Sequence, residues 1–316
     1  MSTYFIGRLA AVVPVLLGVS LLVSSMIYFL PGDPVQLMLT EMGGAAAGQV
    51  TPEQYQTLRH ELGLDEPFIV HYAKYAARAV QGDLGRSYQS NRTVIAAILE
   101  QLPATVQLTF AGLGFAVVLG ITLGVLAALK PNSAGDNLSM FVALAGVSLP
   151  DFWLALLLIF FFSFTLGWVP ATGQGGLERL VLPAAALGLR AAASIARLTR
   201  ASMLEILHQD YITTARAKGL PAWLVVVRHA LKNALIPVVT VIGLQFGNLI
   251  AGAVIVETVF ARQGIGHLAV DAIRTKDFPM IQGTVLFAAT AYVLTNLLVD
   301  ISYAWLDPRI RFGKSS

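Results

Sequence analysis

The sequence contains no cysteine, and this absence removes several classes of function. Disulfides, thiolate nucleophiles and cysteine-ligated metal sites all require that side chain. Histidine does not replace it, because none of the five histidines lies three to five residues from another, the spacing that an HExxH-type metal site needs. The net charge of +3 over 316 residues gives no reason to expect a nucleic-acid partner.

Charged residues are also scarce. They make up 12% of the chain, about half of the roughly 25% found in soluble domains. Hydrophobic residues make up 56%, and the mean hydropathy is +0.71. This composition indicates an integral membrane protein.

Motifs for nucleotide chemistry and hydrolysis are missing as well. The sequence has no Walker A motif, no GxSxG and no GxGxxG preceded by a strand. It also lacks a Ser–Lys dyad and a His-x-x-Glu-His motif of the kind that an intramembrane enzyme uses. We therefore predict no catalytic residues, no bound metal and no bound cofactor. Any ATP-driven work must come from another subunit.

Six apolar segments are each long enough to cross a hydrocarbon core of about 30 Å. We read the first as an uncleaved helix, because a signal peptide has a shorter apolar core and a nearby cleavage site. The fold class is therefore an all-α polytopic membrane protein with six transmembrane helices, at about residues 9–30, 105–129, 138–166, 180–204, 234–256 and 282–305.

The remaining segments complete the domain organisation. Residues 1–30 form the first transmembrane helix, and residues 31–103 form a small external domain, mostly helical, with helices at 52–62 (Thr51 as N-cap) and 68–80. Residues 104–305 form a five-helix transmembrane core that includes a polar segment at 205–237 between helices 4 and 5. Residues 306–316 form a tail.

The distribution of Lys and Arg sets the orientation. Six spans place both termini on one side, and that side carries most of the basic residues of the short loops. We therefore expect both termini and the 205–237 segment in the cytoplasm, and residues 31–103 outside.

Polar residues inside the spans are candidates for a substrate path, because intramembrane charges are costly. Asp151 follows Pro150 in the third span, and Arg190 lies at a similar expected depth in the fourth, so the two could pair. A buried salt bridge and a polar path remain equally open. Gln245 and Asn248 in the fifth span are further path candidates. Gly120-x-x-x-Gly124 and Gly243-x-x-x-Gly247 favour close helix packing over a pathway role.

The 205–237 segment contains a short helix whose ends are marked by sequence. Asp210 is a suitable N-cap, Gly219 can adopt the left-handed conformation after the last turn, and Pro221 prevents continuation. A helix of about two turns is marginal alone and needs a packing partner.

At helical spacing, one face of this short helix runs from bulky to small residues, and it could fit a groove on a partner or lie on the inner membrane surface. Arg216 and Lys218 point away from this face, which consists of Leu204, Leu207 (or His208), Tyr211, Ala215 and Gly219.

Residues 210–221 (DYITTARAKGLP) followed by 228–237 (RHALKNALIP) resemble the cytoplasmic signature of ABC importer permeases, most closely the dipeptide, oligopeptide, nickel and glutathione group. Other matching pieces are PGDP at 31–34, ELGLDEP at 61–67, QGDLG at 81–85, IARLTR at 195–200, GIG at 264–266 and DPRIR at 307–311. They cover essentially the whole chain. The family's general Glu-Ala-Ala-x-x-x-Gly pattern appears here as Thr213-Thr214-Ala215 and Gly219, without the acidic residue.

The resemblance implies a permease subunit in the inner (plasma) membrane that forms half of a translocation path. Its implied partners are a second, similar permease, two ATPase subunits that bind ATP and Mg, and an extracytoplasmic substrate-binding protein. The short helix would then contact an ATPase through Leu207, Asp210, Tyr211, Ala215, Arg216, Lys218 and Gly219.

Alternatives remain at two levels. Among substrates, peptide (dipeptide, oligopeptide or glutathione) is preferred, and nickel or another small solute is the alternative within the same family. Among classes, an ATP-independent secondary transporter would show inverted repeats and broken helices. A membrane receptor would need an internal signalling domain. Neither feature is apparent in the sequence.

Overall fold

The computed structural model describes residues 2–29, 35, 52–61 and 65–306. Every regular element within these residues is a helix, and the only strand-like feature there is an isolated bridge between Arg86 and Thr93. The all-α class predicted from the sequence is therefore confirmed. The predicted N-cap Thr51 and the tail 307–316 lie outside the described residues.

The chain divides into two compact units. The first comprises residues 1–103 and 264–297, and the second comprises residues 104–263 and 298–316. Two long helices, α5 (Val94–Leu129) and α13 (Phe278–Leu306), begin in the first unit and continue into the second.

The first unit contains α1 (Ser2–Tyr28), α3 (Pro52–Glu61), α4 (Phe68–Val80) and α12 (Ile265–Arg274), together with the beginnings of α5 and α13. Its core joins the start of α5 to α12 and α13, through Val94, Ala97, Ile98, Ile265, Ala272 and Met280. Buried Asp277 accepts hydrogen bonds from the Ser87 hydroxyl (2.5 Å) and the Tyr88 N–H (3.2 Å). Gln282 on α13 donates to Ser24 on α1 at 3.2 Å.

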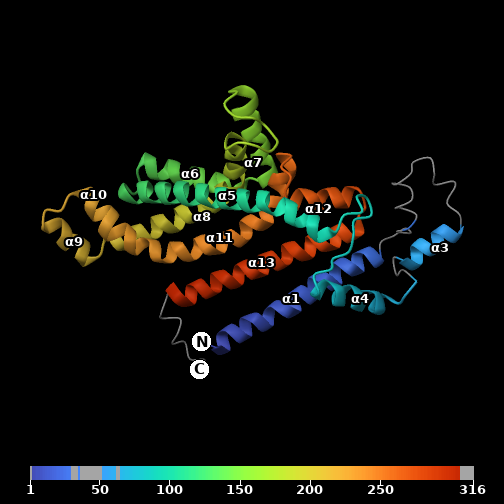
Figure 1. Ribbon diagram of the computed structural model, residues 1–316. Helices are drawn as coiled ribbons and strands as arrows, with labels where there is room; N and C mark the ends of the chain where they lie inside the picture. The colour runs from blue at the N-terminus through green and yellow to red at the C-terminus, as the bar shows by residue number, and fades with distance from the viewer. Residues whose placement is uncertain (1, 30–34, 36–51, 62–64, 307–316) are drawn as a thin grey trace. The chain divides into compact units, whose positions relative to one another are not determined.

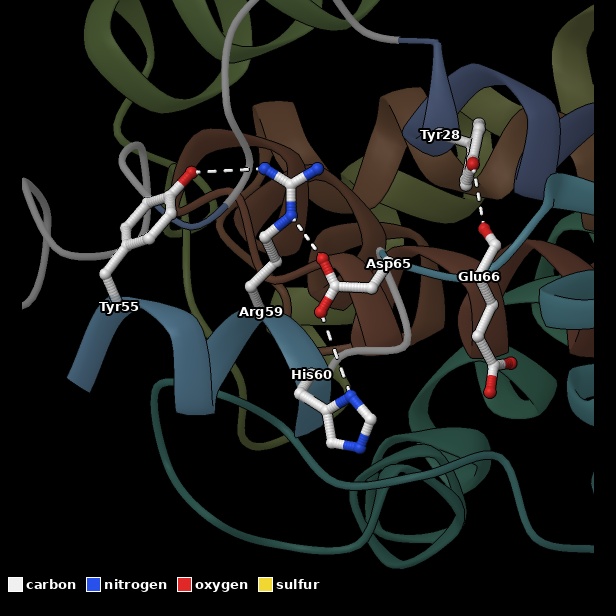
Figure 2. Close-up of polar contacts among 6 residues, drawn as sticks. All are labelled: Tyr28, Tyr55, Arg59, His60, Asp65 and Glu66. Atoms are coloured by element: carbon white, nitrogen blue, oxygen red, sulfur yellow. Dashed lines mark hydrogen bonds and ion pairs between the residues drawn. The ribbon is translucent and has the colours of Figure 1, made fainter. Parts of the chain in front are cut away.

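A small polar cluster joins α3 to Asp65, which follows it (Figure 2). The Arg59 Nε donates to Asp65 Oδ1 at 2.6 Å, and Arg59 Nη1 donates to the Tyr55 hydroxyl at 3.4 Å. His60 Nδ1 lies 3.8 Å from the same carboxylate. These side chains are largely solvent-exposed, so the ion pairs contribute little to stability.

The second unit contains α6 (Ala134–Ser148), α7 (Asp151–Leu158), the π-helix η2 (Ile159–Thr165), α8 (Glu178–Leu207), α9 (Asp210–Ala217), α10 (Ala222–Leu224), the π-helix η3 (Val225–Leu231) and α11 (Lys232–Val259). Helices α5, α6, α8 and α11 run side by side (Figure 1), and α8 packs against both α6 and α11. Helix α8 supplies many of the buried residues, most of them small, including Ala186, Ala191 and Ala192.

Close approach between α5 and α8 explains two of the glycines. A Cβ placed on Gly120 would lie 2.7 Å from the Ala192 carbonyl oxygen, and one on Gly124 would lie 2.6 Å from that of Ala196. Small residues at this spacing allow two helix backbones to approach closely. This agrees with the packing interpretation of the Gly120-x-x-x-Gly124 pattern.

Four helices among the described residues are long and apolar enough to cross a membrane: Val94–Leu129, Glu178–Leu207, Ala222–Val259 and Phe278–Val299. Helix α1 contributes a shorter apolar stretch, Ala10–Ser25. Each of the six predicted spans thus falls on an apolar helical segment, although only four meet the criterion individually. The second predicted span begins earlier than expected, since α5 starts at Val94 and passes through Pro103.

The third predicted span, 138–166, is not one straight helix. Helix α6 ends at Ser148, and the segment Asp151–Thr165 leaves it at an angle of 116°. Pro150 explains the break, because it has no N–H to donate and it disfavours the helical conformation of the preceding residue. The two pieces could still form one bent span, which would make five spans by these criteria.

Candidate functional site

The short helix α9 forms where it was predicted, at Asp210–Ala217. Its N-cap is Gln209, however, and no side chain caps it, so the predicted cap Asp210 is instead the first helical residue. A carboxylate in the first turn still interacts favourably with the helix dipole. At the other end, Gly219 has φ +75°, and the N–H groups of Gly219 and Leu220 donate to the carbonyls of Arg216 (2.9 Å) and Ala215 (3.4 Å). The predicted left-handed glycine is confirmed.

Helix α9 packs against this chain itself. Ile212 is fully buried and Ala215 is 7% exposed, in a cluster with Met203 on α8 and Val225 and Ala230 on η3. Leu207 packs partly buried against the same cluster. Ala215 was predicted on the face offered to a partner; in this chain its small side chain allows α9 to approach its own core.

The exposed surface of α9 carries the other predicted contact residues. Asp210, Arg216 and Lys218 are exposed, and Tyr211 is 41% exposed. The Tyr211 hydroxyl accepts a hydrogen bond from Asn233 Nδ2 at 2.9 Å, which holds the ring toward the start of α11. The sequence analysis did not identify Asn233, because a contact over 22 residues leaves no local pattern.

Gly219 adjoins open space, since a Cβ added there would meet nothing within 4 Å. The glycine is therefore required by its backbone conformation and not by crowding within this chain. The following segment re-enters a helix at Pro221, and its π-helical turn η3 contains the Arg228-His229 part of the signature. Wide π-turns of this kind often occur near functional sites.

Asp151 and Arg190 are brought together at the break between α6 and α7. Asp151 is the first residue of α7, where the free backbone N–H groups favour a carboxylate. The Arg190 Nη1 lies 4.0 Å from Asp151 Oδ2, at the outer limit of an ion pair. The Asp151 side chain is 22% exposed and that of Arg190 is 55% exposed, so the pair is not deeply buried in this chain.

Gln245 and Asn248 bond to each other along α11. Asn248 Nδ2 donates to Gln245 Oε1 at 3.3 Å, and Asn248 is exposed. Their position on an outward surface fits either a path formed with another subunit or a contact with that subunit.

A buried polar cluster at the end of α11 was not singled out by its pattern. Glu257 is fully buried and accepts a hydrogen bond from the Thr105 hydroxyl at 2.6 Å. Arg262 is 2% exposed and donates to Gln107 at 3.2 Å. Burial lowers the pKa of Arg262 from its usual value. The cluster ties the end of α11 to α5.

A second polar contact joins α6 to α8. Arg200 donates from Nε and Nη2 to the two carboxylate oxygens of Asp136, at 2.6 and 2.7 Å. The Asp136 side chain is 3% exposed and also accepts from the Asn132 N–H. The sequence analysis did not identify this pair, because its two residues are 64 positions apart.

No group of three or more His, Asp or Glu side chains that could hold a metal ion occurs among the residues whose structure is described.

Comparison with known sequences decides the family. The profile described as "Binding-protein-dependent transport system inner membrane component" matches residues 120–312, and the corresponding N-terminal profile matches residues 1–109. This chain belongs to that family of ABC importer permeases.

Full-length relatives of this permease are found in several bacteria. It is 42% identical to the "Dipeptide transport system permease protein DppB" of Alkalihalophilus pseudofirmus, over 99% of this chain and 100% of that one. It is 42% identical to the "Di/tripeptide transport system permease protein DppB" of Pseudomonas aeruginosa, over 98% and 99%. It is 43% identical to the "Glutathione transport system permease protein GsiC" of Escherichia coli, over 99% and 100%.

Solved structures resemble this permease in fold. Two inward-facing forms of the MetNI methionine ABC transporter superpose with TM-scores of 0.53 and 0.55, at 19% and 20% identity. Each match covers 67% of this chain and at least 96% of the other. These similarities support the predicted permease fold.

Proposed function

We propose that this permease is a membrane subunit of an ATP-driven importer that takes up peptides. The observation that carries the proposal is the identity of 42–43% over essentially the full length with three permeases named for dipeptides, di- or tripeptides and glutathione. A substrate-binding protein would deliver the peptide from outside, and this chain with a second permease would enclose the path.

The position of α9 supports ATPase contact through the 205–237 segment. This short helix lies between two long apolar helices and presents a polar surface with Tyr211, Arg216 and Lys218. Its other face is attached through Ile212 and Ala215 to the core that includes α8. An ATPase that moves the exposed face would therefore move the end of α8 with it.

The excess of Lys and Arg supports a cytoplasmic location for this segment and for both termini. Six spans follow if α1 and the bent pair α6–α7 each cross the membrane. The residues 31–103 would then be external. Asp151, Arg190, Gln245 and Asn248 remain candidates for the path within this topology.

Purification of the complete transporter tests the proposal. We expect two ATPase subunits and a second permease to co-purify, and ATP hydrolysis to rise when the binding protein is added with a di- or tripeptide or glutathione. Nickel and amino acids serve as comparison ligands in the same assay. Failure of any ATPase to co-purify contradicts the whole assignment, whereas stimulation by nickel and not by peptides contradicts the substrate alone.

Gly219 provides a sharper test of the ATPase contact. In Gly219→Trp a bulky ring projects into the open space beside α9, where an ATPase surface would lie. Gly219→Asn is the matched control, because asparagine tolerates the left-handed conformation better than other residues and is far smaller. We expect the tryptophan variant to lose peptide-stimulated ATP hydrolysis and the asparagine variant to keep most of it. Normal uptake by the tryptophan variant refutes contact at this position.

A further inference from the structure

Helix α4 belongs to the segment predicted as an external domain, yet it lies beside α1 (Figure 1). Tyr72 on α4 places its hydroxyl 2.9 Å from the Ser20 hydroxyl and donates to the Leu17 carbonyl at 3.3 Å. Ser20 and Leu17 lie 8 and 11 residues before the end of α1 at Tyr28. At 1.5 Å per residue these contacts are about 12 and 17 Å from that end. The Tyr72 hydroxyl therefore reaches the middle of the apolar stretch of α1.

The beginning of α4 contacts the end of α1. The Tyr28 hydroxyl donates to the Glu66 carbonyl at 2.9 Å (Figure 2). The Phe68 ring lies 5.3 Å from the Tyr28 ring and 5.5 Å from the Phe29 ring. These contacts, with those of Tyr72, keep one face of α4 against α1 over more than one turn.

The opposite face of α4 is apolar and exposed. Its side chains recur at helical spacing and carry no charge: Ile69, Val70, Ala73, Ala77 and Val80. Ile69 is 76% exposed and Val80 is 90% exposed. Lys74 and Arg78, one turn apart, form a basic edge beside this face, and the Lys74 ammonium group pairs with the Glu66 carboxylate. An apolar face with such an edge is typical of helices that lie at a membrane interface.

The exposed apolar surface continues on α1, where Val13, Leu17 and Leu22 are each at least 50% exposed. In the topology proposed above these α1 side chains face lipid. Tyr72 reaches the same depth, so the neighbouring apolar face of α4 meets the same surroundings. Exposed Arg78 then complements lipid phosphates rather than an apolar protein partner.

We infer that α4 is an interfacial helix whose apolar face contacts acyl chains of the external membrane leaflet, with Arg78 directed to the headgroups and Lys74 paired with Glu66. The inference rests on the proposed topology, in which α1 spans the membrane. It moves part of the segment 31–103 from aqueous solution into the membrane interface.

The absence of native cysteine allows a direct test by single-cysteine spin labelling. Ala73→Cys and Ala77→Cys place labels on the apolar face, Leu22→Cys on α1 serves as the lipid control, and Gln56→Cys on the exposed side of α3 serves as the water control. The complete transporter is reconstituted in vesicles of phosphatidylethanolamine and phosphatidylglycerol, and only variants that retain peptide-stimulated ATP hydrolysis are measured. Collision with oxygen reports lipid, and collision with a water-soluble nickel complex reports water.

We expect the oxygen-to-nickel ratio at positions 73 and 77 to approach that at position 22 and to exceed that at position 56 several-fold. A water-like ratio at 73 and 77 with a lipid-like ratio at 22 overturns the inference while leaving the topology intact. Low collision with both reagents at 73 and 77 also overturns it, because a protein then covers this face. A water-like ratio at position 22 overturns the proposed topology itself.

Discussion

Replacement of Gly124 by alanine tests the close contact between α5 and α8. The added Cβ would lie 2.6 Å from the Ala196 carbonyl oxygen and 2.6 Å from the Thr199 Cβ. Ordinary contact begins at 3.4 Å, so each distance is 0.8 Å too short. Both obstructing groups belong to a buried part of α8, and one is backbone, so a rotamer change cannot relieve the overlap. The two helices must separate locally.

The magnitude follows from two opposing effects. Forcing an extra methyl group into a packed interior costs about 1–3 kcal/mol. Alanine in place of glycine within a helix returns about 0.5–1 kcal/mol. Because the obstruction includes backbone, we expect the packing cost to prevail, with a net loss of about 1–2 kcal/mol.

Gly114 on the same helix is the matched control. A Cβ there would meet nothing within 4 Å, so only the favourable helix effect remains. Gly114→Ala should therefore leave stability unchanged or raise it by up to about 1 kcal/mol. In Gly120→Ala, which has an overlap at 2.7 Å, the loss should resemble that of Gly124→Ala. The double variant should lose less than the sum, because one separation of the helices relieves both overlaps.

Thermal unfolding of the purified protein in detergent measures these differences, and peptide uptake in vesicles is recorded alongside. The expected order of midpoints places Gly114→Ala at or above the wild type and Gly124→Ala below it. If Gly124→Ala unfolds with Gly114→Ala, the described contact between α5 and α8 is incorrect. Full additivity of the 120 and 124 substitutions would also contradict the shared separation.

Three further predictions concern charges and a buried phenol. Asp136→Asn should destabilise the protein by about 3 kcal/mol, which is the lower end of the range for a broken buried pair because Arg200 is 27% exposed. A double-mutant cycle with Arg200→Gln, measured by thermal unfolding, should show that the two losses are coupled. Additive losses would reject a stabilising Asp136–Arg200 pair. Arg190→Ala removes an ion pair to Asp151 at 4.0 Å that is worth at most about 1 kcal/mol. Loss of peptide uptake with a nearly unchanged unfolding temperature supports a role for Arg190 in the substrate path. Unchanged uptake with reduced stability rejects that role. Burial raises the pKa of Tyr75 to about 12, so the folded state favours the neutral phenol. The stability that this contributes is present below the unfolded-state pKa of about 10 and should be lost as the pH rises from 10 to 12. Tyr75→Phe should lose that part of the pH dependence of unfolding.

The positions of helices were predictable where composition and local turn chemistry decide them. Helix α4 has the predicted bounds, and α9 begins at Asp210 with Gly219 in the left-handed conformation. The length of each hydrophobic run located the apolar segments, because a membrane span requires a long continuous apolar stretch. Each of these features depends on residues within one or two turns of each other, and the sequence displays them directly.

Contacts between distant segments were not predictable from these signals. The Asp136–Arg200 and Thr105–Glu257 contacts depend on the rotation and register of one helix against another, which a single amphipathic pattern does not define. The break at Pro150 was visible as a proline within an apolar run. The angle of 116° was not visible, because it depends on what α6 and α7 pack against.

The face of α9 that turns inward shows why a correctly predicted helix does not by itself identify the residues that contact a partner. Tyr211 and Ala215 are one turn apart and lie on the same predicted helix face, but the structure separates them. Ala215 packs inward beside Ile212. Tyr211 is 41% exposed and accepts a hydrogen bond from Asn233. A small residue permits close approach to any surface, so its size alone does not distinguish a partner's groove from the chain's own core. Ile212, fully buried one position after Tyr211, is the residue that settles the direction, because a large apolar side chain loses most by exposure. The surface that we propose for ATPase contact is therefore the one that carries Tyr211, Arg216 and Lys218 and ends beside the open space at Gly219.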